Sequence, residues 1–232
     1  MVGVTVPAAV PGHEGSGRGL FVAFEGGEGC GKSTQVPLLA DWLRHRGHQV
    51  LTTFEPGEGV LGRAIRSIVL DRANTDLSDR AEALLYAADR AQHVAMTIGP
   101  ALSAGQIVIT DRYVDSSIAY QSAGRGQPAE EIGYLSGWAT QGLVADLTVL
   151  LDVPVEVGLA RIRGRAAADR LEAESQVFHE RVRQSFLALA AEAPARYLVL
   201  DARAETEALA ARIAHRIDTV LGVERVHSGE RS

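Results

Sequence analysis

A glycine-rich segment near the start of the chain has the residue types and the spacing of a phosphate-binding loop. Residues 26–33, Gly-Gly-Glu-Gly-Cys-Gly-Lys-Ser, fit the pattern G-x-x-x-x-G-K-[ST] without a mismatch. Glycines let backbone N–H groups surround phosphate oxygens, while the lysine reaches the outer phosphates and the hydroxyl binds magnesium. The segment predicts a nucleoside triphosphate site, and a glycine-rich turn that only joins two elements is the alternative.

The flanks of this segment provide the strand and the helix that such a loop requires. Residues 20–24 form a short apolar run typical of a buried strand, and Val36, Leu39 and Leu43 recur at helical spacing. Strand, loop and helix in this order are the context of the motif, which favours the triphosphate site. The residues that we expect around the triphosphate are Gly26, Gly27, Glu28, Gly29, Cys30, Gly31, Lys32, Ser33 and Thr34.

The bulk properties are those of one globular domain that does not bind nucleic acid. The chain has 232 residues, 46% of them hydrophobic, and a formal net charge of −6. No apolar run has the length of a membrane span, and residues 1–19 lack the charged start and apolar core of a signal peptide. Cys30 is the sole cysteine, so no internal disulfide can form, and we expect a soluble protein of the cytoplasm.

Apolar strands alternate with helical patterns along the chain. We expect strands at 20–24, 49–53, 106–110, 147–151 and 197–200. Helical patterns follow Lys32 and lie at 78–104, 128–140, 155–163, 172–191 and 205–221. This alternation predicts a three-layer α/β/α fold with a five-stranded parallel sheet, and a ligand site at the carboxyl ends of the strands. We expect a disordered leader at 1–18, the domain at 19–222 with a mobile lid at about 161–172, and a mobile tail at 223–232.

An aspartate and an arginine follow the third predicted strand. Asp111 can hold magnesium through water, together with Ser33. Arg112 suits a second, anionic substrate, because a guanidinium binds phosphate with two hydrogen bonds; a surface ion pair is the alternative. A guanine-binding site is excluded, because the sole asparagine, Asn74, is followed by threonine and not by the Lys-x-Asp of that site.

Four arginines gather in the predicted lid, at positions 161, 163, 165 and 170. Such a run is commonly a solvated face. Arginines on a closing loop can instead neutralise a transferring phosphoryl group and exclude water, which is the interpretation that we favour.

Several longer segments have specific sequences: residues 24–34, 85–93 (Leu-Tyr-Ala-Ala-Asp-Arg-Ala-Gln-His), 111–113, 116–121 (Ser-Ser-Ile-Ala-Tyr-Gln) and 169–172 (Asp-Arg-Leu-Glu). With these segments as the most specific matches, the chain closely resembles bacterial thymidylate kinases over about 19–222. The resemblance implies in-line transfer of a phosphoryl group from ATP to dTMP with Mg²⁺, in a homodimer. The acceptor phosphate is already an anion, so no strong general base is needed.

The resemblance also implies roles for individual residues. Glu28 would bind the sugar 3′-hydroxyl, Arg112 would bind the acceptor phosphate, and Arg90 would hydrogen-bond the base. Tyr86, where the family usually has phenylalanine, would stack on the base, and Tyr120 would crowd the sugar 2′ position. The implied acceptor-site residues are Glu28, Pro56, Tyr86, Arg90, Arg112, Ser116, Ser117, Tyr120 and Gln121.

The catalytic arginine of this family lies either in the phosphate loop or on the lid. The loop position is Gly29 here, so the resemblance favours the lid, with Arg165 first and Arg163 second, acting beside Lys32 and Arg112. Phe54 and Glu58 depart from the family pattern Thr-Arg-Glu-Pro-Gly-Gly-Thr, which leaves open a kinase of the same fold with another acceptor. A non-enzymatic nucleotide-binding module is the more distant alternative.

Overall fold

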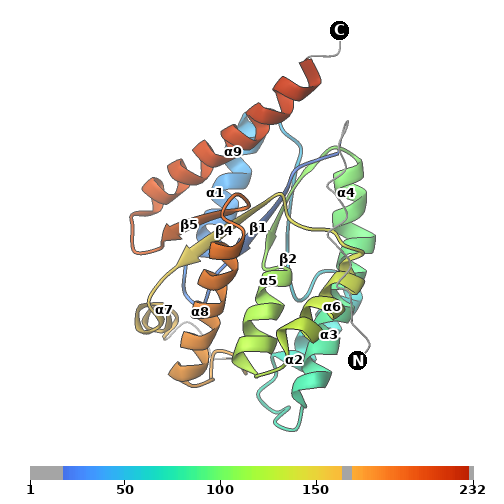
Figure 1. Ribbon diagram of the computed structural model, residues 1–232, viewed down its shortest axis with the longest axis vertical. Coiled ribbons are helices and arrows are strands. Elements are labelled where there is room, and N and C mark those ends of the chain that lie inside the picture. Colours follow the sequence, from blue (N-terminus) through green and yellow to red (C-terminus); the bar gives the residue numbers. More distant parts are fainter. Residues whose placement is uncertain (1–17, 164–168, 230–232) are drawn as a thin grey trace.

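The computed structural model describes residues 18–163 and 169–229 (Figure 1). Five parallel strands form one sheet in the order β2-β3-β1-β4-β5. Their bounds are β1 Phe21–Glu25, β2 Val50–Phe54, β3 Ile107–Asp111, β4 Leu147–Asp152 and β5 Tyr197–Asp201. The predicted strands and the three-layer fold are confirmed, each strand to within one residue at either end.

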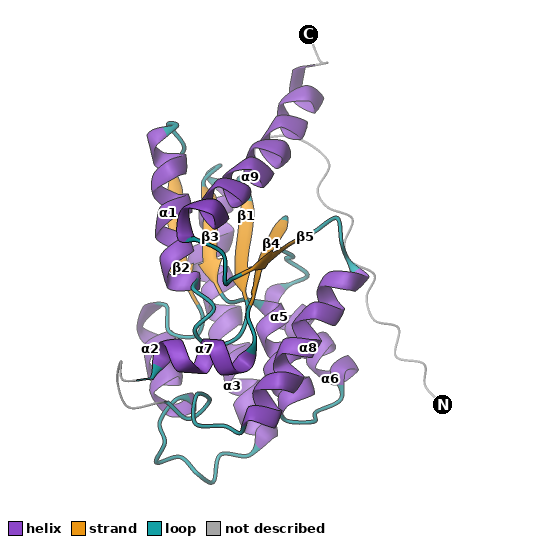
Figure 2. Ribbon diagram, turned by 90° about the vertical axis from the view of Figure 1, so that its left-hand side faces the viewer, coloured by secondary structure: helices purple, strands orange, loops and turns teal. Residues whose placement is uncertain are grey.

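The central strand β1 divides the core because its side chains alternate between the two faces of the sheet. Val22 and Phe24 pack on one face against α1 (Lys32–His45) and α9 (Thr206–Gly229). Phe21 and Ala23 pack on the other face, where most of the remaining helices lie (Figure 2). Helices on both faces cover the sheet, as a parallel sheet requires.

The remaining helices include the elements that carry the site. They are α2 (Gly59–Val69), α3 (Asp79–His93), α4 (Gly99–Ser103), α5 (Val114–Ser117), α6 (Ala129–Thr140), α7 (Val155–Ile162) and α8 (Gln176–Glu192). Two π-helical segments, Val94–Ile98 and Ile118–Gly124, follow α3 and α5. None of the helices in the described part of the chain is long and apolar enough to cross a membrane.

Several predicted helices differ from the observed ones. The stretch 78–104 is divided, because Pro100 has no N–H and Gly99 donates to Val94, five residues earlier. The helix predicted at 172–191 begins at Gln176, because Ser175 caps it by accepting from the Phe178 N–H. Helix α9 continues to Gly229, past the predicted end at residue 221.

Other predicted segments were missed or cannot be compared. Helices α2 and α5 were not predicted, although Ile65 and Val69 on α2 are buried at helical spacing. Most of the predicted leader, 1–17, lies outside the described residues, and so does the centre of the predicted lid, 164–168. A turn at 170–173 belongs to the described part of the predicted lid and leads towards α8.

Candidate functional site

The phosphate loop, residues 26–31, connects β1 to α1 through glycines with left-handed backbone angles. Gly29 has φ +67°, and a Cβ there would lie 2.1 Å from the Gly158 carbonyl oxygen. Gly31 has φ +99° and precedes the first residue of α1. These angles are costly for residues with a side chain, so the glycine spacing sets the path of the loop.

Lys32 lies at the start of α1 with its ammonium group against the loop. Its Nζ donates to the carbonyl oxygens of Gly26 at 3.1 Å and Gly27 at 3.4 Å, and lies 4.0 Å from Asp111 Oδ1. Burial alone would lower the pKa of Lys32, but the nearby Cys30, Asp111 and Glu28 outweigh it and raise the pKa. The lysine therefore stays charged beside the loop.

A cavity of about 550 Å³ opens in front of the loop, and we call it the loop cavity. Of the predicted triphosphate residues, 28–34 line it; Gly26 and Gly27 do not. Ser33 and Asp111 both face it, so a hydroxyl and a carboxylate oxygen are available to a hard cation such as Mg²⁺. The cavity is also lined by Ala202 and Ala204, which follow β5, and by Thr206 and Leu209 in the first turn of α9.

A second cavity of about 160 Å³ adjoins the first, and we call it the acceptor cavity. All nine of the predicted acceptor-site residues line it: Glu28, Pro56, Tyr86, Arg90, Arg112, Ser116, Ser117, Tyr120 and Gln121. They come from the phosphate loop, the turn after β2, helix α3 and the segment after β3. The fold thus brings together residues that lie up to 93 positions apart in the sequence.

Arg112 stands where the two cavities meet. It lines both, and its guanidinium donates to Glu28 Oε1 at 2.6 Å and to Ser116 Oγ at 3.3 Å. The guanidinium also lies over the Tyr120 ring, 4.9 Å from its centre, and the Tyr120 hydroxyl donates to Glu28 Oε1 at 2.7 Å. Burial would raise the pKa of Glu28, but Arg112, Lys32 and the Tyr120 hydroxyl hold it at about 2. The junction therefore holds an ionised carboxylate between two cations.

Arg90 is held by a buried network on the wall of the acceptor cavity. It donates to Glu55 Oε2 at 2.7 Å, to Ser117 Oγ at 2.9 Å and to the Tyr113 carbonyl oxygen at 3.0 Å. Glu55 Oε1 pairs with His93 Nδ1 at 2.9 Å. Both ends of the Arg90–Glu55 ion pair are 2% exposed at the side chain, so the arginine is fixed in place.

Glu25, at the end of β1, supports the segment that carries Arg112. Its carboxylate accepts from the Tyr113 N–H at 2.8 Å, the Ser116 N–H at 3.2 Å and the Ser116 hydroxyl at 2.6 Å. Complete burial and the charge of Asp115 raise the pKa of Glu25 from 4.5 to about 7, against these hydrogen bonds. Arg112 itself has φ 73°, a left-handed angle that is strained for an arginine.

The predicted lid arginines are placed only in part. Arg165 lies outside the described residues, and Arg163 is exposed at the end of α7 and lines neither cavity. Arg161, two residues earlier, lines the loop cavity and donates to the Gly29 carbonyl oxygen at 3.4 Å. The end of α7 therefore lies against the phosphate loop.

The residues that depart from the family pattern occupy different places. Phe54 lines the loop cavity beneath Arg66, whose guanidinium lies 5.8 Å from the ring centre. Glu58 is not among the residues lining the acceptor cavity in the described chain. Tyr86 does line it, its hydroxyl has no hydrogen-bond partner among the described residues, and burial raises its pKa.

Sequence reasoning missed several residues of the site. Arg66 on α2 lines both cavities and donates to the Pro56 carbonyl oxygen at 2.7 Å. Glu55 and Glu172 also line both cavities. The spacing of Ile65 and Val69 was the available signal for α2, and it would have placed Arg66 shortly after the Glu-Pro-Gly turn.

Comparison with known proteins agrees with this arrangement. The family described as thymidylate kinase matches residues 24–213. The chain is 54% identical over 206 residues to a thymidylate kinase of Clavibacter sepedonicus, covering 88% of this chain and 96% of that protein. It is 53% identical over 203 residues to the one of Cutibacterium acnes (88% and 98%) and 48% identical over 210 residues to the one of Trichlorobacter lovleyi (88% and 99%). The chain belongs to the thymidylate kinase family.

Proposed function

We propose that this protein is a nucleoside monophosphate kinase that converts ATP and dTMP into ADP and dTDP, a step towards dTTP. One observation carries the proposal: a phosphate-loop cavity adjoins a smaller cavity, and arginines 66 and 112 line both. In the reaction, the bond from the γ-phosphorus to the ADP oxygen breaks while an oxygen of the dTMP phosphate bonds to the phosphorus. The junction of the two cavities is where these atoms would meet.

Catalysis would come from positioning and from charge neutralisation. The phosphoryl group carries negative charge on its outer oxygens while it is transferred. The positive charges of Lys32 and Arg112 at the junction of the two cavities would neutralise it. Ser33 and Asp111 would hold Mg²⁺, which supplies further neutralisation between the phosphates when it is bound. On the lid, Arg165 and Arg163 would act on the same charge, and the contact of Arg161 with the Gly29 carbonyl supports a lid close to the loop.

The acceptor cavity supports recognition of a deoxynucleoside monophosphate with a pyrimidine base. Arg112 would bind the phosphate, while Arg90 and Gln121 would contact the base beside Ser116 and Ser117. The Tyr120 hydroxyl is held by Glu28, which supports its role against a sugar 2′-hydroxyl.

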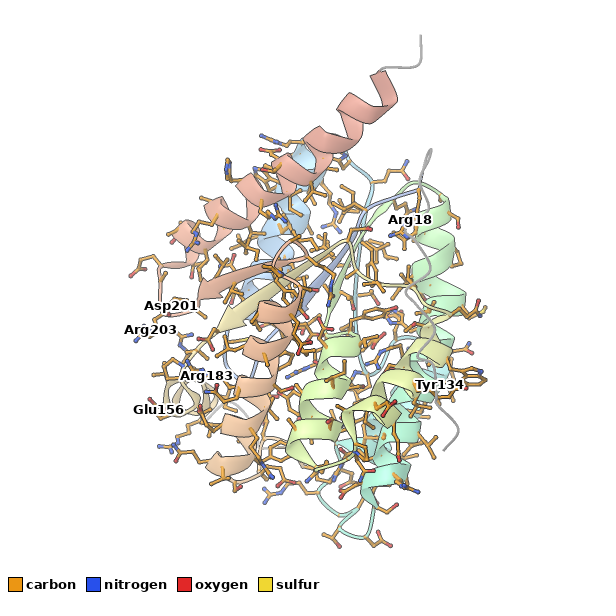
Figure 3. The ribbon with its side chains drawn as sticks, viewed as in Figure 1. Arg18, Tyr134, Glu156, Arg183, Asp201 and Arg203 are labelled. Atoms are coloured by element: carbon orange, nitrogen blue, oxygen red, sulfur yellow. The ribbon has the colours of Figure 1, made fainter. Side chains whose placement is uncertain are left out.

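We also propose a homodimer that forms through α3 and α6. The exposed fractions of Leu84 on α3 and of Tyr134 and Trp138 on α6 are 57%, 53% and 73%. Tyr134 points outward from α6 in Figure 3, and apolar side chains gathered on adjacent helices mark interaction surfaces. Light scattering should give twice the chain mass, and Trp138→Glu should give a monomer; a monomeric wild-type protein would contradict the dimer.

We further propose that the enzyme works in the cytoplasm. Cys30 lies in the phosphate loop, with its Sγ 3.5 Å from Lys32 Nζ, and it has no cysteine partner in the chain. Reduced thiols of this kind persist in a reducing compartment. Cell fractionation with an antibody against the protein would test the location, and recovery in an extracellular fraction would contradict it.

A coupled ADP-release assay tests the reaction. The enzyme is given ATP, Mg²⁺ and one of dTMP, dUMP, UMP, CMP or thymidine as acceptor. We expect the highest kcat/KM with dTMP and a large loss with UMP, because Tyr120 excludes the 2′-hydroxyl. Preference for another acceptor would keep the kinase and contradict dTMP as the substrate, whereas ADP release that does not depend on any acceptor would contradict the kinase.

A further inference from the structure

A buried carboxylate on α3, Glu82, accepts hydrogen bonds from three side chains in two other segments of the chain. It is 0% exposed, and α3 packs against the π-helical segment Ile118–Gly124 beyond α5 (Figure 1). Glu82 Oε1 accepts from Gln121 Nε2 at 2.9 Å and from Arg125 Nε at 3.3 Å. Glu82 Oε2 accepts from Arg170 and, at 3.4 Å, from Arg125 Nη2. Nothing in the proposed reaction uses this carboxylate directly.

The charge of Glu82 determines how the Gln121 amide is turned. Burial would raise the pKa of Glu82, but hydrogen bonds from Arg170 and Gln121 and the charge of Arg125 lower it, so the carboxyl is ionised. An ionised carboxylate only accepts hydrogen bonds, whereas an amide has a donating NH₂ and an accepting oxygen. Gln121 must therefore turn its NH₂ towards Glu82.

The opposite end of the same amide faces the acceptor cavity. Gln121 lines this cavity, and its Oε1 accepts no hydrogen bond from the described residues. Some side-chain oxygens and nitrogens of the described chain are fully buried and have no hydrogen-bond partner, but Gln121 Oε1 is not one of them. Gln121 thus presents an acceptor to the cavity.

Arg90 presents the complementary group to the same cavity. Three of its five N–H groups are used by Glu55, Ser117 and Tyr113. A guanidinium has no acceptor, so any further contact that Arg90 makes in the cavity is a donation. The cavity wall therefore offers one donor and one acceptor from two fixed side chains.

This pattern distinguishes pyrimidine bases by their chemistry. Thymine and uracil carry a C4 carbonyl, which accepts, beside an N3–H, which donates. Cytosine carries an amino group and an unprotonated N3, the reverse order. We propose that Glu82 is a positioning residue that sets the base selectivity of the acceptor cavity, because it fixes the Gln121 amide with its oxygen towards the base. The proposal rests on the proposed function, since it assumes a pyrimidine nucleotide in this cavity.

The same carboxylate also holds part of the cavity wall through Arg170. Arg170 donates from Nε to the Val69 carbonyl oxygen at 2.9 Å and from its backbone N–H to Leu70 at 3.1 Å. Its neighbours Asp169 and Leu171 line the acceptor cavity. A shift of this wall would change KM for every acceptor, whereas a turned amide would change the ratio between thymine and cytosine nucleotides.

The test measures kcat/KM for dTMP, dUMP and dCMP in the wild-type enzyme and in Glu82→Gln. We expect the wild type to prefer dTMP over dCMP by at least about 10³-fold, since a site built to pair with one hydrogen-bond pattern rejects the reverse. A glutamine at position 82 can donate as well as accept, so Gln121 can turn, and the preference should fall by at least about 10-fold. An unchanged preference in the folded variant would overturn the proposal.

Glu174→Gln is the matched control, because Glu174 accepts from Arg125 in the same network without touching Gln121. Its dTMP-to-dCMP ratio should stay within about twofold of the wild type. In the background of Gln121→Leu, Glu82→Gln should have no further effect on the ratio, because it acts through that amide. A further fall in this background would overturn the proposal.

The wild-type enzyme keeps the test decisive if Glu82→Gln fails to fold. N3-methyl-dTMP lacks the N3–H that Gln121 would accept, so its kcat/KM should be at least about 100-fold below that of dTMP. Equal turnover of the two nucleotides would overturn the inference while leaving the kinase intact. Failure of the wild type to use dTMP at all would instead overturn the proposed function.

Discussion

The loop cavity and the acceptor cavity are built in opposite ways. The phosphate end of the loop cavity is one continuous segment, residues 28–34, whose shape depends on backbone angles at glycines. The acceptor cavity is made of side chains from distant segments, fixed by buried ion pairs such as Arg90–Glu55. The first is specified by local sequence, and the second only by the folded chain. Substitutions should therefore damage them through different mechanisms.

The largest effect should come from Lys32, the sole lysine of the chain, whose ammonium group lies against the phosphate loop in the loop cavity. Lys32→Ala should lower kcat by about 10³-fold, the size seen when one positioned stabilising group is removed. The hydrogen bonds from Lys32 Nζ to loop carbonyl oxygens are 3.1 and 3.4 Å long, so the free energy of unfolding should change much less than kcat. Steady-state kinetics and thermal melting test this. Full activity in Lys32→Ala would contradict the mechanism.

On the acceptor side, the largest effect on stability should come from Arg90. Arg90→Met leaves the Glu55 carboxylate, 2% exposed at the side chain, without its guanidinium partner. Removing one member of a buried pair costs about 3 kcal/mol or more in the free energy of unfolding. Urea denaturation measures this loss.

Arg80→Met is the matched control for Arg90→Met, on the same helix. Arg80 pairs with Glu131 at 3.4 Å, but its side chain is 76% exposed. An exposed pair of this kind contributes roughly 0–1 kcal/mol. Equal losses in the two variants would contradict the view that buried charge holds the acceptor cavity together.

The difference between the cavities also explains how far sequence could predict them. The phosphate loop could be placed because its chemistry lies in eight consecutive residues, and the strands because their apolar runs are short and bounded. Arg112 could be proposed from its place directly after a strand and Asp111, but the other predicted acceptor-site residues came from the resemblance. Arg90 and Ser117 meet across 27 positions, and Glu28 and Tyr120 across 92. Propensity and spacing carry no information about such meetings.

Other features follow from burial and could not be predicted. Glutamate is usually exposed in proteins, yet Glu82 is completely buried and accepts a hydrogen bond from Arg170, 88 positions away. The pKa of Glu25 depends on how deeply β1 is covered and on the nearby Asp115. The sequence pattern identifies which residues can ionise, and only the packing decides in which direction their pKa values move.

The backbone character of the loop cavity can be tested with alanine at its glycines. Gly29→Ala should cost about 2 kcal/mol or more in the free energy of unfolding, because a left-handed angle and a Cβ 2.1 Å from the Gly158 oxygen act together. Gly31→Ala should cost about 1–2 kcal/mol, since φ is +99° but no atom lies within 4 Å of its Cβ. Gly27→Ala, with neither feature, should cost least. Denaturation of the three variants gives the order, and a different order would contradict this account.

The smallest effect concerns the pH dependence of Glu25 behind the acceptor cavity. Because burial raises its folded pKa from 4.5 to about 7, the native protein keeps a proton that the unfolded chain releases between these values. The contribution of Glu25 to the free energy of unfolding is fully present below pH 4.5 and is lost as the pH rises through 7. The free energy of unfolding falls in this range by at most about 1.4 kcal/mol per pH unit. Glu25→Gln should remove this slope between pH 6 and 7.

Glu28 is the natural control for that slope, because it lies three residues away with its pKa lowered to about 2. A group with so low a pKa is ionised in both the folded and the unfolded protein between pH 6 and 7, so Glu28→Gln should leave the slope unchanged there. Burial and the charge of Glu55 raise the pKa of Asp89 to about 6. Asp89 therefore also lowers the stability as the pH rises, but mainly below pH 6. Denaturation at half-unit pH steps separates these contributions. If Glu25→Gln kept the wild-type slope between pH 6 and 7, the buried carboxyl behind Arg112 would be ionised at neutral pH, and the acceptor side would depend on charge in the same way as the junction at Glu28.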